Sequence, residues 1–204
     1  MTDAHPNARL EALCDGVFAI AMTLLILDVR IPSVETIATS GQLWAAVRHL
    51  MPALAAFVLS FGIILITWVN HHATMKLVGG TSAPFMYANG FLLLTVVMLP
   101  FPTGMVGAFL WTDHAAPAVV LYDGVLALQA VGWVLMSGAA RRGRLTVDER
   151  AATAMRMNGR NGYFAFALYA LLAALAVWMP LTAAIVTALT WAFWLAFGLR
   201  MKHA

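Results

Sequence analysis

Charged residues are scarce in this chain of 204 residues, and their scarcity excludes a water-soluble globule. They make up 10% of the sequence, whereas 62% of the residues are hydrophobic and the mean hydropathy is +0.84. Soluble domains carry about 25% charged residues. So few charges cannot cover a soluble surface, and so much apolar surface cannot stay unfolded in water. The composition therefore predicts a protein that crosses a membrane several times.

The sequence is also poor in groups that bind metals or perform catalysis. Cys14 is the single cysteine, which excludes an internal disulfide and a metal site built from several thiolates. Gly79-Gly80 lacks the rest of a phosphate-binding pattern. The sequence shows no zinc motif, no catalytic triad context and no paired carboxylates within an apolar run. We therefore expect neither an enzyme nor a cofactor or bound metal.

Six apolar runs are long enough to cross a bilayer as helices, which need about 20 residues each. The sequence therefore predicts an all-α membrane protein with six transmembrane helices per subunit, forming a single domain over residues 1–204. The first run contains the acids Glu11 and Asp15, which is not typical of a cleavable secretory signal. The predicted helices cover about residues 7–29, 43–69, 84–110, 117–140, 162–178 and 181–199.

Two features interrupt these apolar runs. Pro100 and Pro102 lie near the outer end of the third run, where proline is expected to kink or break the helix. Asp123 lies near the outer end of the fourth run, so we expect its carboxylate at the membrane interface.

The basic residues predict the orientation of the chain. With six spans, both termini lie on one side, and that side collects ten of the twelve lysines and arginines. The positive-inside rule then predicts that both termini lie on the cytoplasmic side of the membrane. We expect this membrane to be the plasma membrane. The basic stretch at 141–160 determines topology and can contact membrane lipid, so no nucleic acid partner is expected. The ten residues are Arg9, Lys76, Arg141, Arg142, Arg144, Arg150, Arg156, Arg160, Arg200 and Lys202.

The first predicted helix changes character along its length. Arg9 and Asp15 lie near its cytoplasmic end, and no charged residue follows until Asp28. Within this uncharged part, one helical stripe is formed by Ile20, Thr23, Leu24 and Leu27. Because the opposite face is also apolar, the stripe could face lipid, another helix or a symmetry axis. A narrow apolar constriction can gate an ion path by excluding water.

A second group of polar residues is predicted at the same depth as Asp15. Trp68, His71 and His72 close the second helix, and Asn89 lies early in the third. Adjacent histidines point about 100° apart on a helix, so a shared metal is not expected. We predict instead that one histidine pairs with Asp15, without specifying which.

These residues together resemble a known family. Arg9-x-x-x-Leu13-Cys14-Asp15 is similar to the Arg-x-x-x-Phe-Ser-Asp signature of the transmembrane protein 175 potassium channels, with Leu replacing Phe and Cys replacing Ser. The continuation Gly-Val-Phe-Ala-Ile-Ala-Met-Thr-Leu-Leu resembles that family's first helix. So do Trp68 with the two histidines, and Asn89 with Pro-Phe-Pro-Thr in the third helix.

The resemblance implies a potassium-permeable cation channel without a pore-loop filter. Its first helix would line a central pore, with the constriction at Ile20, further pore-lining positions at Leu24 and Leu27, and ion coordination by Thr23. One six-helix set per chain implies a homotetramer like the prokaryotic members, with potassium as the permeant ion. The resemblance also implies a polar network that braces the first three helices, formed by Arg9, Asp15, Trp68, His71, His72 and Asn89.

Two other function classes stay open from the residues alone. A proton-coupled transporter or proton pathway could use Asp15 with His71 or His72 as relay groups. Nothing titratable lies between Ile20 and Leu27, however, and a relay needs groups across the whole membrane. A membrane-embedded enzyme or a scaffold is the third class, and a monomeric protein would favour it.

Overall fold

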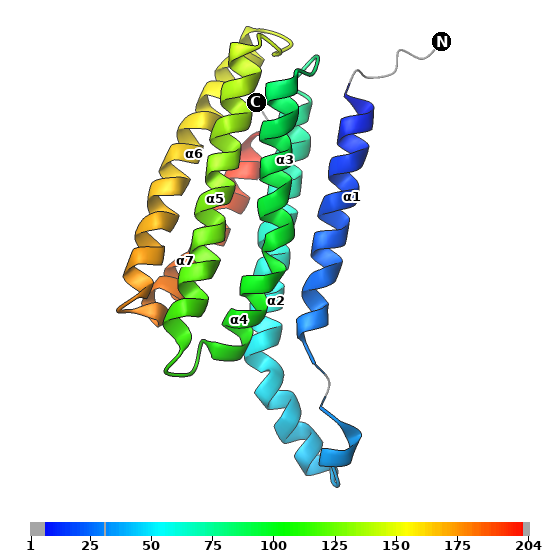
Figure 1. Cartoon of the computed structure of the whole chain (residues 1–204), viewed down its shortest axis with the longest axis vertical. Coiled ribbons are helices and arrows are strands. Elements are labelled where there is room, and N and C mark those ends of the chain that lie inside the picture. The colour runs from blue at the N-terminus through cyan, green and yellow to red at the C-terminus, as the bar shows by residue number, and fades with distance from the viewer. Residues whose placement is uncertain (1–6, 31, 202–204) are drawn as a thin grey trace.

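Helices account for nearly all of the described chain (Figure 1). The structure, a computed structural model, describes residues 7–30 and 32–201. Its α-helices are α1 (Ala8–Leu24), α2 (Ser40–Met75), α3 (Ala83–Met98), α4 (Pro100–Phe109), α5 (Ala115–Arg142), α6 (Glu149–Ala176) and α7 (Pro180–Met201). Two short 3-10 helices, η1 (Leu25–Asp28) and η2 (Val34–Thr36), lie between α1 and α2.

Side-chain caps fix where three of the helices begin. Thr39 and Gln42 form a reciprocal capping box at the start of α2. Ser82 accepts a hydrogen bond from the backbone of Phe85 at the start of α3. Asp148 Oδ1 accepts one from the Ala151 amide, 2.7 Å away, at the start of α6. These polar groups satisfy backbone donors that the first helical turn leaves free.

The break predicted in the third helix is present between α3 and α4. Helix α3 ends at Met98 and α4 begins at Pro100, a residue that has no backbone N–H to continue the hydrogen-bond ladder. Since α3 and α4 together form one apolar segment from Ala83 to Phe109, the described helices make six helical segments, as the sequence predicts.

The fifth helical segment is longer than its predicted span. Helix α6 begins at Glu149, well before residue 162, because Asp148 caps it inside the basic stretch. Within the described ranges, four segments are long and apolar enough to cross a membrane. They are Ala8–Asp28, Ser40–Met75, Ala83–Phe109 and Ala115–Arg142, while Pro180–Trp191 is a shorter apolar helix.

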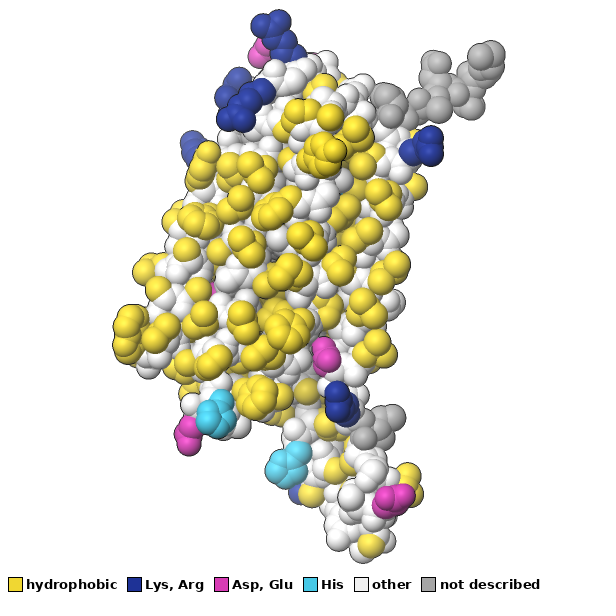
Figure 2. Space-filling model, in the orientation of Figure 1, with side chains coloured by type: hydrophobic (Ala, Val, Ile, Leu, Met, Phe, Trp, Pro, Cys, Tyr) yellow, Lys and Arg dark blue, Asp and Glu magenta, His cyan; other side chains and the backbone are white. Residues whose placement is uncertain are grey.

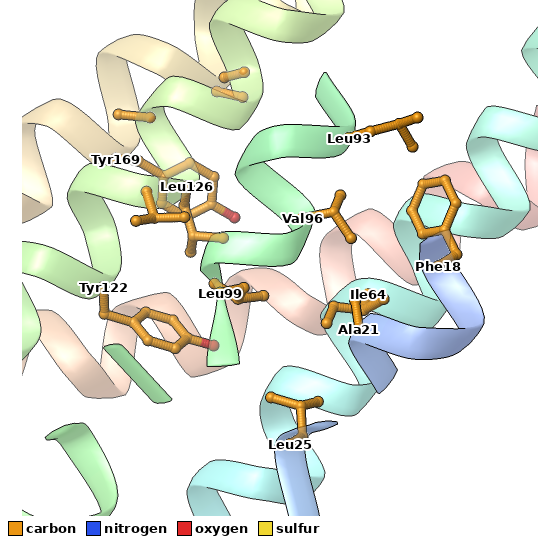
Figure 3. Packing of buried hydrophobic residues seen from close by; sticks show 14 of the residues in the cluster. Phe18, Ala21, Leu25, Ile64, Leu93, Val96, Leu99, Tyr122, Leu126 and Tyr169 are labelled. Atoms are coloured by element: carbon orange, nitrogen blue, oxygen red, sulfur yellow. The ribbon is translucent and has the colours of Figure 1, made fainter. Parts of the chain in front are cut away.

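Helix α1 lies at the edge of the bundle, whereas α5 and α6 form its most extensive helix pair (Figure 1). Helix α1 packs on α2 and α3. Figure 3 shows the contact, in which Phe18, Ala21 and Leu25 lie beside Ile64 of α2 and Val96 of α3. The main core therefore joins α1 to the rest of the bundle along one side only.

Candidate functional site

One face of α1 is completely buried in the bundle. Cys14, Phe18, Ala21 and Leu25 each have no exposed surface. They recur at helical spacings of three and four residues, so they form one continuous strip. This strip is how α1 attaches to α2 and α3.

The predicted stripe lies on the other face of α1. Ile20 is 59% exposed, Leu24 38% and Leu27 69%, and Thr23 is also exposed. Packing inside the subunit, one of the three alternatives left by the sequence, is therefore excluded. The stripe is free to meet another subunit or lipid. Hydropathy could not make this distinction because both faces of the helix are apolar.

Thr23 is the hydroxyl within this exposed face. Its Oγ1 donates a hydrogen bond to the Ile20 carbonyl oxygen, 2.8 Å away. The hydroxyl proton is therefore occupied, while the oxygen lone pairs can still accept. Such an oxygen can coordinate a cation or a water molecule.

The polar residues at the end of α1 form hydrogen bonds to α2 and α3. Trp68 Nε1 donates to Asp15 Oδ1 at 2.8 Å. His71 Nε2 and Asn89 Oδ1 are 2.7 Å apart, and Asn89 Nδ2 donates to Cys14 Sγ at 3.1 Å. His71 and Asn89 are each 1% exposed. Two side chains of α1 are thus held by side chains from two neighbouring helices.

The predicted histidine partner of Asp15 is not observed. Trp68 donates to Asp15 instead, and His71 is directed to the Asn89 amide. His72 stacks against Trp68, with ring centroids 6.1 Å apart and planes at 25°. Trp68 lies about one helical turn before the two histidines on α2, and from there its indole N–H reaches Asp15.

Arg9 is exposed, and among the described residues no hydrogen bond joins it to this network. The structure therefore brings together Asp15 with Trp68, and His71 with Asn89, and it leaves Arg9 outside. Within the same described ranges, no group of three or more His, Cys, Asp or Glu side chains could hold a metal ion.

Asn7 makes a contact with the α2–α3 loop that the sequence does not predict. It precedes α1, yet its side chain does not cap the helix. Its Nδ2 donates instead to the Val78 carbonyl oxygen at 2.6 Å, and the residue is 1% exposed. An Asn just before a helix is typical of a helix cap. The sequence therefore gives no signal for the long-range hydrogen bond from Asn7 to Val78.

Asp123 is buried, not interfacial as predicted. The residue has no exposed surface, and Thr187 of α7 donates to its Oδ1 at 2.7 Å. Its Oδ2 has no hydrogen-bond partner in the described part of the chain. The prediction used position along the apolar run, and it could not foresee that α7 covers this end of α5.

Comparisons with known proteins find relatives of this chain. The family model for the endosomal/lysosomal potassium channel TMEM175 matches residues 9–100. A potassium channel of Chamaesiphon minutus is 36% identical over 190 residues, covering 91% of this chain and 93% of the relative. A potassium channel of Streptomyces collinus is 40% identical over 171 residues, covering 78% of this chain and 80% of the relative.

A solved structure shows the same fold. It is the crystal structure of a lysosomal potassium-selective channel TMEM175 homolog from Chamaesiphon minutus, with a TM-score of 0.78 and 33% sequence identity. The match covers 92% of this chain and 96% of the other. High identity over nearly the whole length of both chains, together with the shared fold, shows that this chain belongs to the TMEM175 family.

Proposed function

We propose that this chain forms a potassium-permeable cation channel, as a homotetramer of single six-helix domains covering residues 1–204. The observation that carries the proposal is the two-sided segment of α1 and η1, which is fully buried on one face and exposes Ile20, Leu24 and Leu27 on the other. A helix at the edge of each subunit can line a shared central pore. Two relatives that match 91% and 78% of the chain are named potassium channels.

The constriction of this pore is assigned to Ile20, with Leu24 and Leu27 continuing the apolar wall. A ring of aliphatic side chains impedes ions because water leaves a narrow apolar passage. Thr23 is the residue of this face whose oxygen can coordinate a partly dehydrated potassium ion. Asp15, Trp68, His71 and Asn89 act as the brace that fixes α1, and His72 supports Trp68 by stacking.

Both termini are assigned to the cytoplasmic side of a plasma membrane. The start of α1, the α2–α3 loop and the α5–α6 loop lie at one end of the bundle in Figure 1, and this end carries most of the basic residues. Lys202, counted in the positive-inside prediction, lies outside the described residues. Arg30 and Arg48 belong to the opposite end.

The test is potassium flux into liposomes, with Ile20→Asn as the diagnostic variant. A polar side chain at the constriction keeps water in the passage, so we expect potassium flux to rise and the preference over sodium to fall. Ile26→Asn is the matched control, because Ile26 is exposed but lies about 120° from Ile20 on a helical wheel.

Unchanged flux and selectivity in Ile20→Asn, or equal effects of both variants, would overturn the constriction. A pH-sensitive dye in the same liposomes addresses the proton alternative. Proton flux that exceeds potassium flux and disappears in Asp15→Asn would favour the proton pathway over the potassium channel.

A further inference from the structure

A groove of about 1110 Å³ lies between the end of α5 and the beginning of α6. It is separate from the proposed pore, because α6 and α1 occupy opposite edges of the bundle in Figure 1. The groove belongs to the end of the molecule that carries the α5–α6 loop. The potassium channel proposal assigns no role to it.

The loop end of this groove is strongly basic. Four arginines line this end, Arg141, Arg142, Arg144 and Arg156, together with two acids, Asp148 and Glu149. A fifth, Arg160, lies one turn further along α6, beside the level of Ser137. The Asp148 carboxylate is already occupied in capping α6 through the Ala151 amide. Figure 2 shows the resulting group of Lys and Arg side chains at this end of the visible face. Such a concentration of guanidinium groups suits a phosphate, which arginine binds through paired N–H donors.

The other end of the groove is apolar. Val134 and Leu135 of α5 and Tyr163 of α6 line it there. Val134 lies two helical turns from Arg141, a distance of about 10 Å along the helix. Between the two ends lies Ser137, which is 1% exposed and whose hydroxyl has no hydrogen-bond partner among the described residues. The groove thus offers guanidinium groups and then apolar walls, with the enclosed Ser137 side chain at the level between them.

We propose that this groove binds an anionic phospholipid of the cytoplasmic leaflet. The phosphate would lie among the arginines, the glycerol region at the level of Ser137, and the start of an acyl chain along Val134, Leu135 and Tyr163. The assignment rests on the proposed orientation, which places the arginines at the headgroup level. A free phosphate has no part that would use the apolar end.

Gly138 provides a way to fill the groove without changing its charge. It lines the groove, and a Cβ at this position would meet no other atom within 4 Å. The Cβ of a leucine would therefore meet no clash there, and its side chain would occupy the space of the lipid. Gly124, also on α5 with nothing within 4 Å of its Cβ, lies outside the groove and is the matched control.

The experiment is native mass spectrometry of the full-length protein with equimolar phosphatidylglycerol and phosphatidylcholine. We expect the protein to retain phosphatidylglycerol in preference. Arg156→Gln and Arg160→Gln should each lower its retention roughly fivefold, the loss expected for one juxtamembrane basic residue. Gly138→Leu should lower it as well, while Gly124→Leu and Arg48→Gln should leave it unchanged. Thermal unfolding of each variant shows that the fold is kept.

Three outcomes would overturn the proposal. Equal retention of both lipids would exclude anionic recognition. Wild-type retention by folded Gly138→Leu or by both arginine variants would place the lipid elsewhere. Displacement of phosphatidylglycerol by an equimolar amount of glycerol phosphate would show a site for soluble phosphates, since the acyl chain would then add nothing to binding.

Discussion

Single side chains hold the N-terminal part of α1 in place. Trp68 reaches Asp15 from α2, and Asn89 reaches Cys14 from α3. Inside a membrane such interhelical hydrogen bonds add to packing in holding helices together. The Cys14 sulfur is a weaker acceptor than the hydroxyl of the family's signature serine, so the bond from Trp68 is the stronger of these two tethers.

Trp68→Phe should therefore loosen α1. The change keeps an aromatic ring beside His72 but leaves the Asp15 carboxylate without its donor, and we expect a loss of about 1–3 kcal/mol in stability. Thermal unfolding of the purified protein measures it. Trp44→Phe is the control, since Trp44 is 66% exposed on the same helix. Equal midpoints for the two variants would show that the Trp68–Asp15 bond contributes nothing.

A second prediction concerns Asp123, whose Oδ1 accepts a hydrogen bond from Thr187 and whose Oδ2 has no partner among the described residues. Thr187→Val removes the single donor to a buried carboxyl group and should destabilise the protein by about 1–3 kcal/mol. Asp123→Asn keeps an acceptor for Thr187 and should have a smaller effect. Unfolding midpoints of both variants make the comparison, and a more severe loss in Asp123→Asn would contradict it.

At the scale of elements, the sequence predicts six apolar helices and the structure contains six helical segments, but their ends follow different signals. Hydropathy rises only at Gly162, whereas the cap at Asp148 starts α6 earlier. Pro100 marks a break because its missing N–H acts locally. Hydropathy alone could not identify the exposed face of α1, since apolar side chains surround the whole helix. The stripe that the family resemblance assigns to the pore is on the face that is exposed.

Close packing between helices depends on small residues at the crossing points. A Cβ at Gly107 of α4 would lie 2.9 Å from the Ala53 Cα of α2, too close for either backbone to stay in place. Gly107→Ala should therefore separate these helices and destabilise the protein by about 1–3 kcal/mol. Gly124→Ala, where nothing lies within 4 Å, should be neutral or stabilising. Equal unfolding midpoints for the two variants would show that close contact between α2 and α4 at Gly107 does not contribute to stability.

At the scale of the whole molecule, the bundle has a closely packed part and a peripheral helix. Helices α3, α5 and α6 pack closely, and α1 stands at the edge with one face covered (Figure 1). The apolar surface on its other face is matched by exposed apolar side chains elsewhere, such as Leu171 on α6, which is 67% exposed. Exposure alone therefore does not identify a subunit interface, and the oligomer needs its own test.

Disulfide cross-linking distinguishes the surface around Leu27 from the surface around Leu171. The cysteine variants are made with Cys14→Ser, which removes the native cysteine. Leu27→Cys should form covalent dimers under mild oxidation, because the proposed tetramer brings the α1 helices together at its axis. Leu171→Cys, nearly equal in exposure, should stay monomeric on a denaturing gel. Dimers from both variants, or from Leu171→Cys alone, would contradict the proposed arrangement.

The one-sided attachment of α1 has a consequence for the cell that makes the protein. In the proposed assembly a lone subunit holds only a fraction of the wall of the ion path, and that fraction is turned outward. A newly inserted monomer therefore cannot leak ions, however long it waits for partners. Oligomerisation and the creation of the conducting path are one event, so the membrane stays sealed throughout synthesis.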